Sequence, residues 1–162
     1  MTTLAARTPA TTLTPGEARW HAGHRFEHLA TRASTAGRLA VIRATCRPGF
    51  DPPRHVHAHE DELFHVLEGQ VTFEIGGERT TARAGDTVWA PRQVPHAFRV
   101  DSPVARMLIT ITPGEGERLF AEFSVPAETP GLPPLGEHLP DFEAMGRRMG
   151  ELGIGVAGPP LA

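Results

Sequence analysis

Short segments in the middle of the chain alternate between apolar and polar side chains. From residue 70 to residue 75 every second position is valine, phenylalanine or isoleucine, which is the period of a strand with one buried face. Gly76 and Gly77 follow, and adjacent glycines accept the positive φ angles of a two-residue hairpin turn. Residues 78–83 are therefore predicted to return as the partner strand.

Six further strands are predicted between residues 26 and 112, each bounded by turn-forming residues. They are residues 26–32, 38–46, 62–67, 86–90, 96–100 and 104–112. Many short strands at close spacing, without helices between them, favour an antiparallel sandwich or barrel. No long internal repeat is visible, so we expect one barrel rather than two.

The last fifty residues follow a different pattern. We expect a short helix over residues 115–123, a Pro/Gly-rich connector over residues 126–134, and a helix over residues 141–152 with Asp141 at its start. Apolar side chains recur at helical spacing in the second helix, at Phe142, Met145, Met149 and Leu152. We interpret this stripe as packing against the barrel core rather than as a lid.

Composition narrows the possible partners. The 162 residues fit one domain, and 40% hydrophobic with 22% charged residues is ordinary for a globular protein. The formal net charge is -3 and no basic run exists, so a nucleic-acid partner is disfavoured, because phosphates require a basic face. No run of eighteen apolar residues is present, so no membrane span is expected.

The cysteine content and the first residues bear on location and domain limits. Cys46 is the only cysteine, which fits a reducing compartment, and residues 1–14 lack the apolar run of a secretory signal, so we expect a cytoplasmic protein. We predict a flexible arm over residues 1–16, a barrel over residues 17–124, and a connector with a docked helix over residues 125–162.

Residues 49–69 contain the strongest chemical pattern. His55 and His57 are two apart, so a strand places both imidazoles on one face. Glu62 opens the next predicted strand, and a hairpin would bring its carboxylate opposite them. His96 starts a later strand. Three imidazoles and one carboxylate suit one divalent transition metal per chain, such as iron, manganese, nickel, cobalt or zinc.

Other titratable residues in this part of the chain are assigned no role. We interpret His59 as a loop residue, and Glu60 and Asp61 as solvent-facing turn carboxylates. His65 alternates away from Glu62 along its strand and is expected to face outward. Four further histidines have no spacing that implicates them: His21, His24, His28 and His138.

The same segment resembles the cupin family. The first cupin motif is matched at every position, by Gly49, His55, His57, Glu62 and Gly69. The second is matched by Gly85, Pro91 and His96. Gln93 stands where the motif has glycine, and Val100 where it has asparagine. Neither position is a ligand, so only the turn between the two strands is placed in doubt.

The resemblance implies an all-β fold, a double-stranded β-helix or jelly-roll barrel, here with a short C-terminal helical segment. It also implies that the metal ligands are His55, His57, Glu62 and His96. The wider sequence is similar to small bacterial single-domain cupins of the quercetin 2,3-dioxygenase type. This similarity implies oxidation of an enol-like or phenol-like small molecule by dioxygen, with Glu62 as both ligand and catalytic base.

Two other functions remain open, because one barrel supports many chemistries. The first is a metal-dependent polyketide cyclase or isomerase that uses no oxygen, and the second is a non-catalytic small-molecule binding protein. Candidate walls of a substrate pocket inside the barrel are Phe64, Val66, Trp89, Phe98 and Met107. A homodimer is expected, because so small a barrel leaves sheet edges open, and the strand over residues 26–32 is the element expected to be shared.

Overall fold

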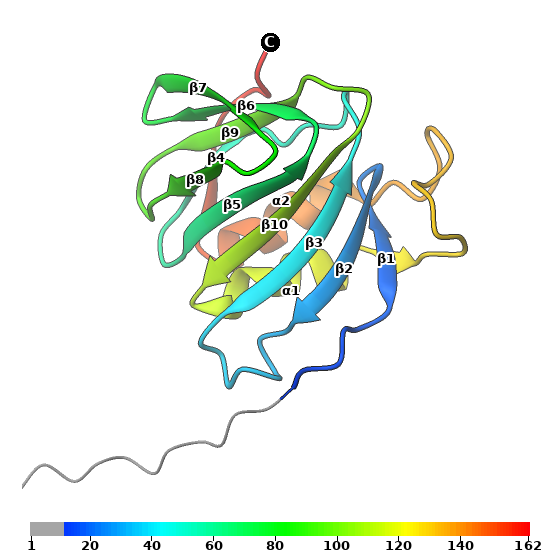
Figure 1. Cartoon of the computed structure of the whole chain (residues 1–162). Coiled ribbons are helices and arrows are strands. Elements are labelled where there is room, and N and C mark those ends of the chain that lie inside the picture. The colour runs from blue at the N-terminus through cyan, green and yellow to red at the C-terminus, as the bar shows by residue number, and fades with distance from the viewer. Residues whose placement is uncertain (1–11) are drawn as a thin grey trace, which may run out of the picture.

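The computed structural model describes residues 12–162, which form two facing antiparallel sheets and two helices (Figure 1). Residues 1–11, most of the predicted arm, lie outside this range. The larger sheet has the strand order β11-β1-β2-β3-β10-β5-β8 and the smaller sheet β12-β4-β9-β6-β7. Two antiparallel sheets of this kind are the expected all-β jelly-roll architecture.

The strand bounds follow the predicted pattern closely between residues 40 and 112. The larger sheet contains β1 (Ala18–His21), β2 (His24–Ala30), β3 (Ala40–Cys46), β5 (Asp61–Glu68), β8 (Thr87–Ala90), β10 (Ala105–Thr112) and β11 (Val125–Pro126). The smaller sheet contains β4 (Arg54–His57), β6 (Gln70–Ile75), β7 (Glu78–Arg83), β9 (His96–Val100) and β12 (Ile154–Gly158).

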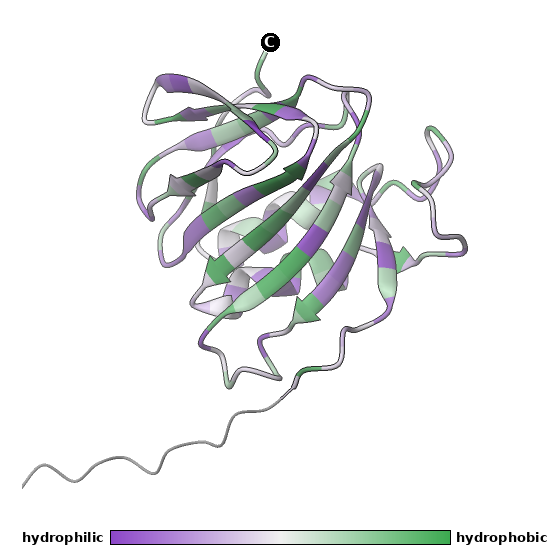
Figure 2. Ribbon diagram, viewed as in Figure 1, coloured by the Kyte–Doolittle hydropathy of each residue, from purple (hydrophilic) through white to green (hydrophobic). Residues whose placement is uncertain are grey.

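Alternation of side chains explains why these segments pair into two layers with a core between them. Buried and less buried positions alternate along β2, β3 and β10, and Figure 2 shows the matching alternation of hydrophobic and hydrophilic residues. The buried side chains of both sheets meet in one cluster that includes Ile42, Phe73 and Met107. The barrel interior around this cluster is therefore a packed core.

The predicted hairpin between β6 and β7 is confirmed. Ile75 pairs with Glu78, which leaves Gly76 and Gly77 as the two turn residues, with φ angles of 59° and 88°. Both angles are positive, as a type I′ turn requires, and the turn twist matches that of the strands.

β4 was implied only by the spacing of His55 and His57, and β1, β11 and β12 were not predicted. β11 has two residues, and β12 has the sequence IGVAG, in which small residues hide any alternation. Both are held by tertiary pairing, β11 to β1 and β12 to β4. The C-terminal segment thus adds a strand to the smaller sheet beside β4.

Both helices lie behind β3 and β10 in the view of Figure 1. A short 3-10 turn, η1 (Gly114–Gly116), leads into α1 (Glu117–Glu122), and α2 spans Phe142–Glu151. The cap predicted for α2 is confirmed, because the Asp141 side chain accepts a hydrogen bond from the Ala144 amide at 2.9 Å. Within residues 12–162, no helix is long and apolar enough to cross a membrane.

The expected shared strand is internal. β2 pairs with β1 on one side and β3 on the other, so its hydrogen-bonding groups are already used within the chain. Within one chain, residues 24–27 of this strand are therefore not a free edge, while the homodimer and its shared element stay predictions.

Candidate metal centre and its cavity

Four side chains from three strands converge between the sheets. They are His55 and His57 on β4, Glu62 on β5 and His96 on β9, and one nitrogen or oxygen of each lies within 4.8 Å of those of the other three. His55 pairs directly with His96 across β4 and β9 of the smaller sheet. Glu62 reaches them from the larger sheet, so the predicted hairpin between β4 and β5 is wrong: the two strands face each other across the barrel.

Two of the imidazoles are oriented by the backbone. His55 donates a hydrogen bond from Nδ1 to the Pro53 carbonyl at 2.9 Å, and His96 donates from Nδ1 to the Val94 carbonyl at 3.1 Å. A carbonyl only accepts, so each Nδ1 carries a proton, and each Nε2 is the ring nitrogen that points into the group. This is the usual arrangement for a metal-ligating histidine.

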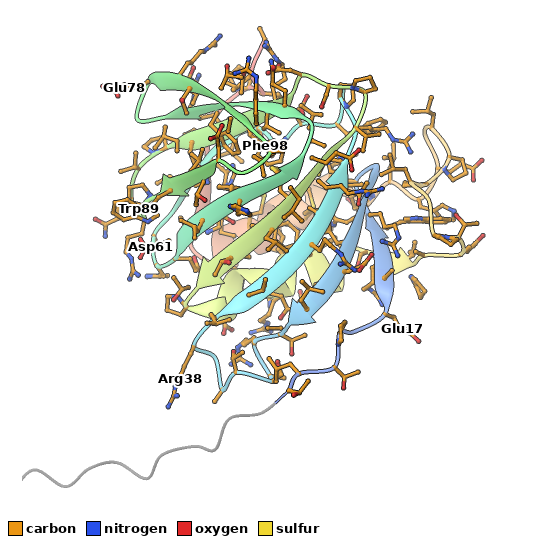
Figure 3. All side chains as sticks on the ribbon, viewed as in Figure 1. Glu17, Arg38, Asp61, Glu78, Trp89 and Phe98 are labelled. Carbon is orange, nitrogen blue, oxygen red and sulfur yellow. The ribbon has the colours of Figure 1, made fainter. Side chains whose placement is uncertain are left out.

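The third imidazole is oriented by a buried carboxylate. His57 Nδ1 lies 3.1 Å from Glu60 Oε2, and Glu60 is only 1% exposed. The expectation that Glu60 is a solvent-facing turn residue is therefore wrong. Its neighbour Asp61 does lie at the surface, beside Trp89 in Figure 3, where it pairs with Arg92 at 2.8 Å. The three-residue spacing from His57 to Glu60 was the available signal in the sequence.

Glu62 presents its two oxygens to different surroundings. Oε2 lies 2.9 Å from His96 Nε2 and 3.7 Å from His57 Nε2. Oε1 makes no hydrogen bond to any residue in the range 12–162, and it is not among the fully enclosed polar atoms that lack a partner. One oxygen is therefore directed to the imidazoles and the other is open to the cavity that Glu62 lines.

Two of the four side chains, Glu62 and His55, are in metal-ligating forms at neutral pH. Burial raises the pKa of Glu62, but His57, His96 and His55 together outweigh it and lower that pKa to about 2. Burial and the neighbouring His96 lower the pKa of His55 to about 4. Burial also lowers the pKa of His57, yet the carboxylates of Glu62 and Glu60 more than compensate, so its net shift is upward. The group thus holds an ionised carboxylate and a neutral imidazole, the forms that ligate metals.

These donors fit a divalent transition metal. Three imidazole nitrogens and one carboxylate oxygen are a borderline set that suits iron, manganese, nickel, cobalt or zinc. Three imidazole rings and an ionised carboxylate converge in a buried space, and polar groups gathered there are costly unless they are paired with a partner such as a cation. A metal that accepts five or six ligands would retain open positions for a small molecule.

Comparisons with known proteins agree with this geometry. The cupin domain family model matches residues 42–115, which contain all four converging side chains. Residues 42–115 therefore contain a cupin domain. The fold agrees with a solved RmlC-like cupin from Shewanella frigidimarina, which has a TM-score of 0.53 and 18% identity, and the match covers 60% of this chain and 82% of that one.

Two curated relatives are similar to parts of this chain. Quercetin 2,3-dioxygenase from Bacillus subtilis is 29% identical over 100 residues, which cover 62% of this chain and 30% of the relative. The polyketide synthase CurC from Streptomyces cyaneus is 31% identical over 84 residues, which cover 51% of this chain and 53% of the relative. The chain therefore spans less than a third of the first relative and about half of the second.

The departure from the second cupin motif does not disrupt the turn. Gln93 occupies the glycine position with a φ angle of 64°, so it adopts the left-handed conformation that glycine normally supplies. The backbone N–H of Gln93 donates a hydrogen bond to the His57 carbonyl at 2.7 Å, which links this turn to the ligand strand β4. The turn that the sequence placed in doubt is thus retained, at some cost in backbone strain.

A cavity of about 300 Å³ opens beside the four side chains. This volume is at the lower end of the range for small-molecule sites. Three of the four predicted ligands line it, namely His55, His57 and Glu62. The remaining lining residues are mostly apolar and come from β1, β2, β5, β9, β10, β12, both helices and the loop over residues 50–53.

Only some of the residues predicted as pocket walls line this cavity. Phe64 and Phe98 line the cavity. Val66 and Met107 do not, because they are fully buried in the packed core farther along their strands. Trp89 does not line the cavity either, since its side chain is 59% exposed on the outer face of β8, at the rim of the molecule in Figure 3. Inward and outward positions of so short a strand could not be told apart from sequence.

The helix α2 both packs against the barrel and borders the cavity. Met149 and Leu152 are buried in a cluster with Leu119 and Ile154, as the core-packing interpretation predicted. Phe142 is 55% exposed, so it is not a core residue, yet it lines the cavity together with Met145 and Met149. The apolar stripe therefore serves as core at one end and as a cavity wall at the other.

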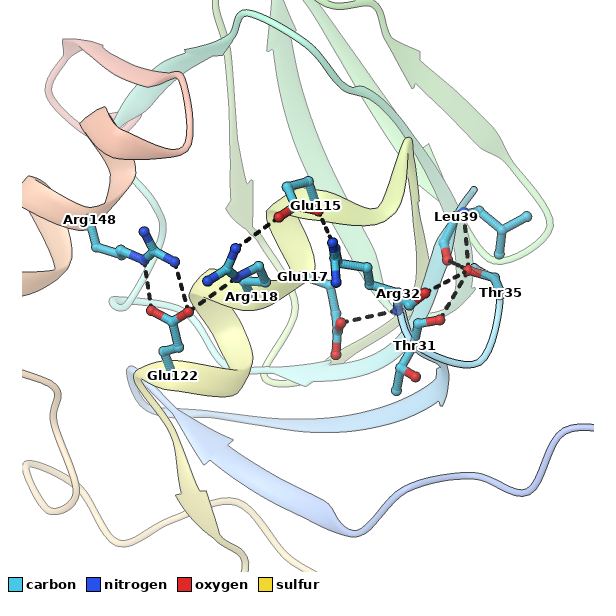
Figure 4. Close-up of polar contacts among 9 residues, drawn as sticks. All are labelled: Thr31, Arg32, Thr35, Leu39, Glu115, Glu117, Arg118, Glu122 and Arg148. Atoms are coloured by element: carbon cyan, nitrogen blue, oxygen red, sulfur yellow. Dashed lines mark hydrogen bonds and ion pairs between the residues drawn. The ribbon is translucent and has the colours of Figure 1, made fainter. Parts of the chain in front are cut away.

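Ion pairs position α2 over α1. Arg148 of α2 makes two hydrogen bonds to the Glu122 carboxylate of α1, at 2.7 and 2.9 Å. Figure 4 shows that the contacts continue from Glu122 through Arg118 to Glu115, and from there to Arg32. The two helices that border the cavity are thereby linked to the end of β2.

Two histidines that sequence reasoning set aside also line the cavity. His21 at the end of β1 and His24 at the start of β2 are both buried. Burial lowers the pKa of each to about 4, so both are neutral at pH 7. Their positions depend on the unpredicted strand β1, and nothing in the spacing WHAGH indicates that they face a site 30 or more residues away in sequence.

Proposed function

We propose that this protein is a metal-dependent enzyme that oxidises an enol-like or phenol-like aromatic molecule with dioxygen. The observation that carries the proposal is the donor set of three imidazoles and one carboxylate beside an apolar cavity. Similarity to quercetin 2,3-dioxygenase supports the substrate class, over the 30% of that relative that is aligned.

The proposed roles follow from the contacts. His55, His57, Glu62 and His96 would hold one divalent metal, which when bound supplies Lewis-acid polarisation of a substrate oxygen. Glu62 takes the proton of the substrate hydroxyl at Oε1, the oxygen that is open to the cavity. Phe64 and Phe98 hold the aromatic body and exclude water.

Oxygen consumption tests this proposal directly. The protein is loaded in turn with Fe²⁺, Mn²⁺, Ni²⁺, Co²⁺ and Zn²⁺ and assayed with quercetin, catechol and a simple enol in an oxygen electrode. We expect uptake with at least one redox-active metal and none after chelation. A metal-loaded protein that consumes no oxygen with any of these compounds contradicts the dioxygenase assignment.

The similarity to CurC favours a second candidate, the non-oxidative cyclisation or isomerisation of a polyketide. The same carboxylate would take a proton next to a carbonyl, and no oxygen would be used. Product formation under nitrogen from a poly-β-ketone model compound distinguishes this candidate from the first. If the compounds bind but are not converted in either assay, the protein is a binding module.

A further inference from the structure

The cavity contains a polar group apart from the four candidate metal ligands. His21 comes from β1, which belongs to the larger sheet, and it is 6% exposed. It lines the cavity among aromatic side chains: its ring stacks on Phe26 at 5.4 Å between centroids and meets Phe120 edge-on at 5.2 Å. A polar group held this way in an apolar wall is a typical means of fixing ligand orientation.

A hydrogen bond to the backbone sets the tautomer of His21. Its Nδ1 lies 2.9 Å from the Phe123 carbonyl at the end of α1. Because a carbonyl only accepts, Nδ1 carries the proton. Burial lowers the pKa of the ring to about 4, which keeps it neutral and leaves a lone pair on Nε2.

The free nitrogen of His21 differs from that of its neighbour His24. His24 bonds through Nε2 to the Phe50 carbonyl at 3.0 Å, and its Nδ1 is fully enclosed without a partner. His21 Nε2 also makes no hydrogen bond within residues 12–162, but it is not among the enclosed atoms. The acceptor on His21 is therefore accessible, whereas the acceptor on His24 is not.

We propose that His21 Nε2 accepts a hydrogen bond from a hydroxyl group of the bound ligand and so orients the ligand in the cavity. His21 is a positioning and specificity residue in this view. The ligand class is then narrower: a flat, largely apolar molecule with one oxygen for the metal centre and a second hydroxyl for His21. The two-oxygen requirement rests on the proposed function, whereas the contact with His21 does not require a metal.

The test compares two probes that differ only in the donor, 2-naphthol and 2-methoxynaphthalene. Their dissociation constants are measured by titration calorimetry with the purified protein, before and after chelation. We expect 2-naphthol to bind about three- to tenfold more tightly than the ether in both states, which is the size of one hydrogen bond to a buried acceptor.

Substitutions assign this preference to a single nitrogen. In His21→Asn the amide nitrogen replaces Nδ1 and still reaches the Phe123 carbonyl, but no acceptor remains at the Nε2 position, so the preference should disappear. His21→Gln provides an oxygen near that position and should restore part of the preference. His24→Gln keeps a donor for the Phe50 carbonyl and should bind both probes as the native protein does.

The outcomes are distinct. A preference that persists in His21→Asn, or equal binding of both probes to the native protein, overturns the inference. A preference that disappears on chelation assigns the hydroxyl to the metal centre and overturns it too. Failure of the oxygen assay, with the His21-dependent preference intact, contradicts only the proposed dioxygenase activity.

Discussion

The two sides of the cavity are built in different ways. The ligand side consists of β4, β5 and β9, and its four converging side chains lie within 42 consecutive residues that match the family motif. The opposite side consists of β1, the start of β2, α1 and α2, which are drawn from both ends of the described chain. The candidate metal ligands therefore lie on the first side, whereas the second side mainly sets the shape of the cavity.

This difference indicates where specificity is encoded. Side chains on the ligand side are fixed by hydrogen bonds, such as those of His55 to Pro53 and His57 to Glu60. The opposite side relies on apolar packing and on exposed ion pairs such as Arg148–Glu122. Apolar packing accepts changes of shape more readily than a ligand set accepts changes of donor. We therefore expect substitutions on the two sides to separate metal binding from ligand recognition.

The strongest expected effect is loss of metal from the ligand side. His96→Ala removes one of three imidazoles and leaves the Glu62 carboxylate without its 2.9 Å partner, so bound metal should fall to near zero. His21→Asn, on the opposite side, should keep the native metal content. Elemental analysis of both variants checks this. Equal metal contents would remove the distinction between the two sides.

The next effect concerns turnover with metal present. Glu62→Gln keeps the shape and a coordinating oxygen but removes the charge and the basicity. If Glu62 is the base, activity of the metal-saturated variant should fall by about a hundredfold or more, the usual size of a lost general base. If it is only a ligand, excess metal should restore near-native turnover in the steady-state assay.

A buried partner of the ligands should have a smaller effect on affinity. Glu60→Ala removes the acceptor of His57 Nδ1, and such losses lower metal affinity by roughly 10- to 100-fold. Asp61→Ala is the matched control, because it removes an adjacent carboxylate that pairs with Arg92 at the surface. Competition with a chelator measures both. Equal affinities of the two variants would mean that Glu60 has no role in orienting His57.

On the opposite side, the ion pair that links the helices can be removed alone. Arg148→Met keeps the aliphatic length but loses the hydrogen bonds to Glu122. We expect backbone amides of α2 to exchange hydrogen several-fold faster while those of β4 are unchanged, because exposed pairs stabilise locally and weakly. Mass spectrometry of deuterium uptake checks this. Unchanged exchange in α2 would mean that apolar packing alone holds the helix.

The same division explains what the sequence could and could not predict. The central strands and the four converging side chains were predictable, because alternation and a fixed motif are local signals. Glu60 was misjudged because its burial depends on the position of η1 over the turn, where Gly116 approaches its side chain. β12 depends on the pairing of Ile154 with His57, and the proposed role of His21 depends on its hydrogen bond to Phe123. Both contacts join segments that are distant in the chain, so they leave no periodic pattern in the sequence.

The smallest expected effect tests the one departure from the motif on the ligand side. Gln93 holds a φ angle of 64°, a conformation that costs a side-chain-bearing residue about 1–2 kcal/mol. Gln93→Gly removes that strain but adds about 0.4–1 kcal/mol of unfolded-chain entropy, so a net stabilisation of about 0.5–1 kcal/mol is expected. For a chain of this size the melting temperature should rise by about 1–4 °C.

Gln93→Ala is the matched control for that strain, because alanine keeps the Cβ atom and should bring no comparable gain. Metal content should be unchanged in both variants, since both retain the backbone N–H that donates to the His57 carbonyl. Scanning calorimetry at neutral pH, with metal removed, measures the difference. If glycine is no more stable than alanine at this position, the turn is unstrained and the ligand side tolerates glutamine without cost.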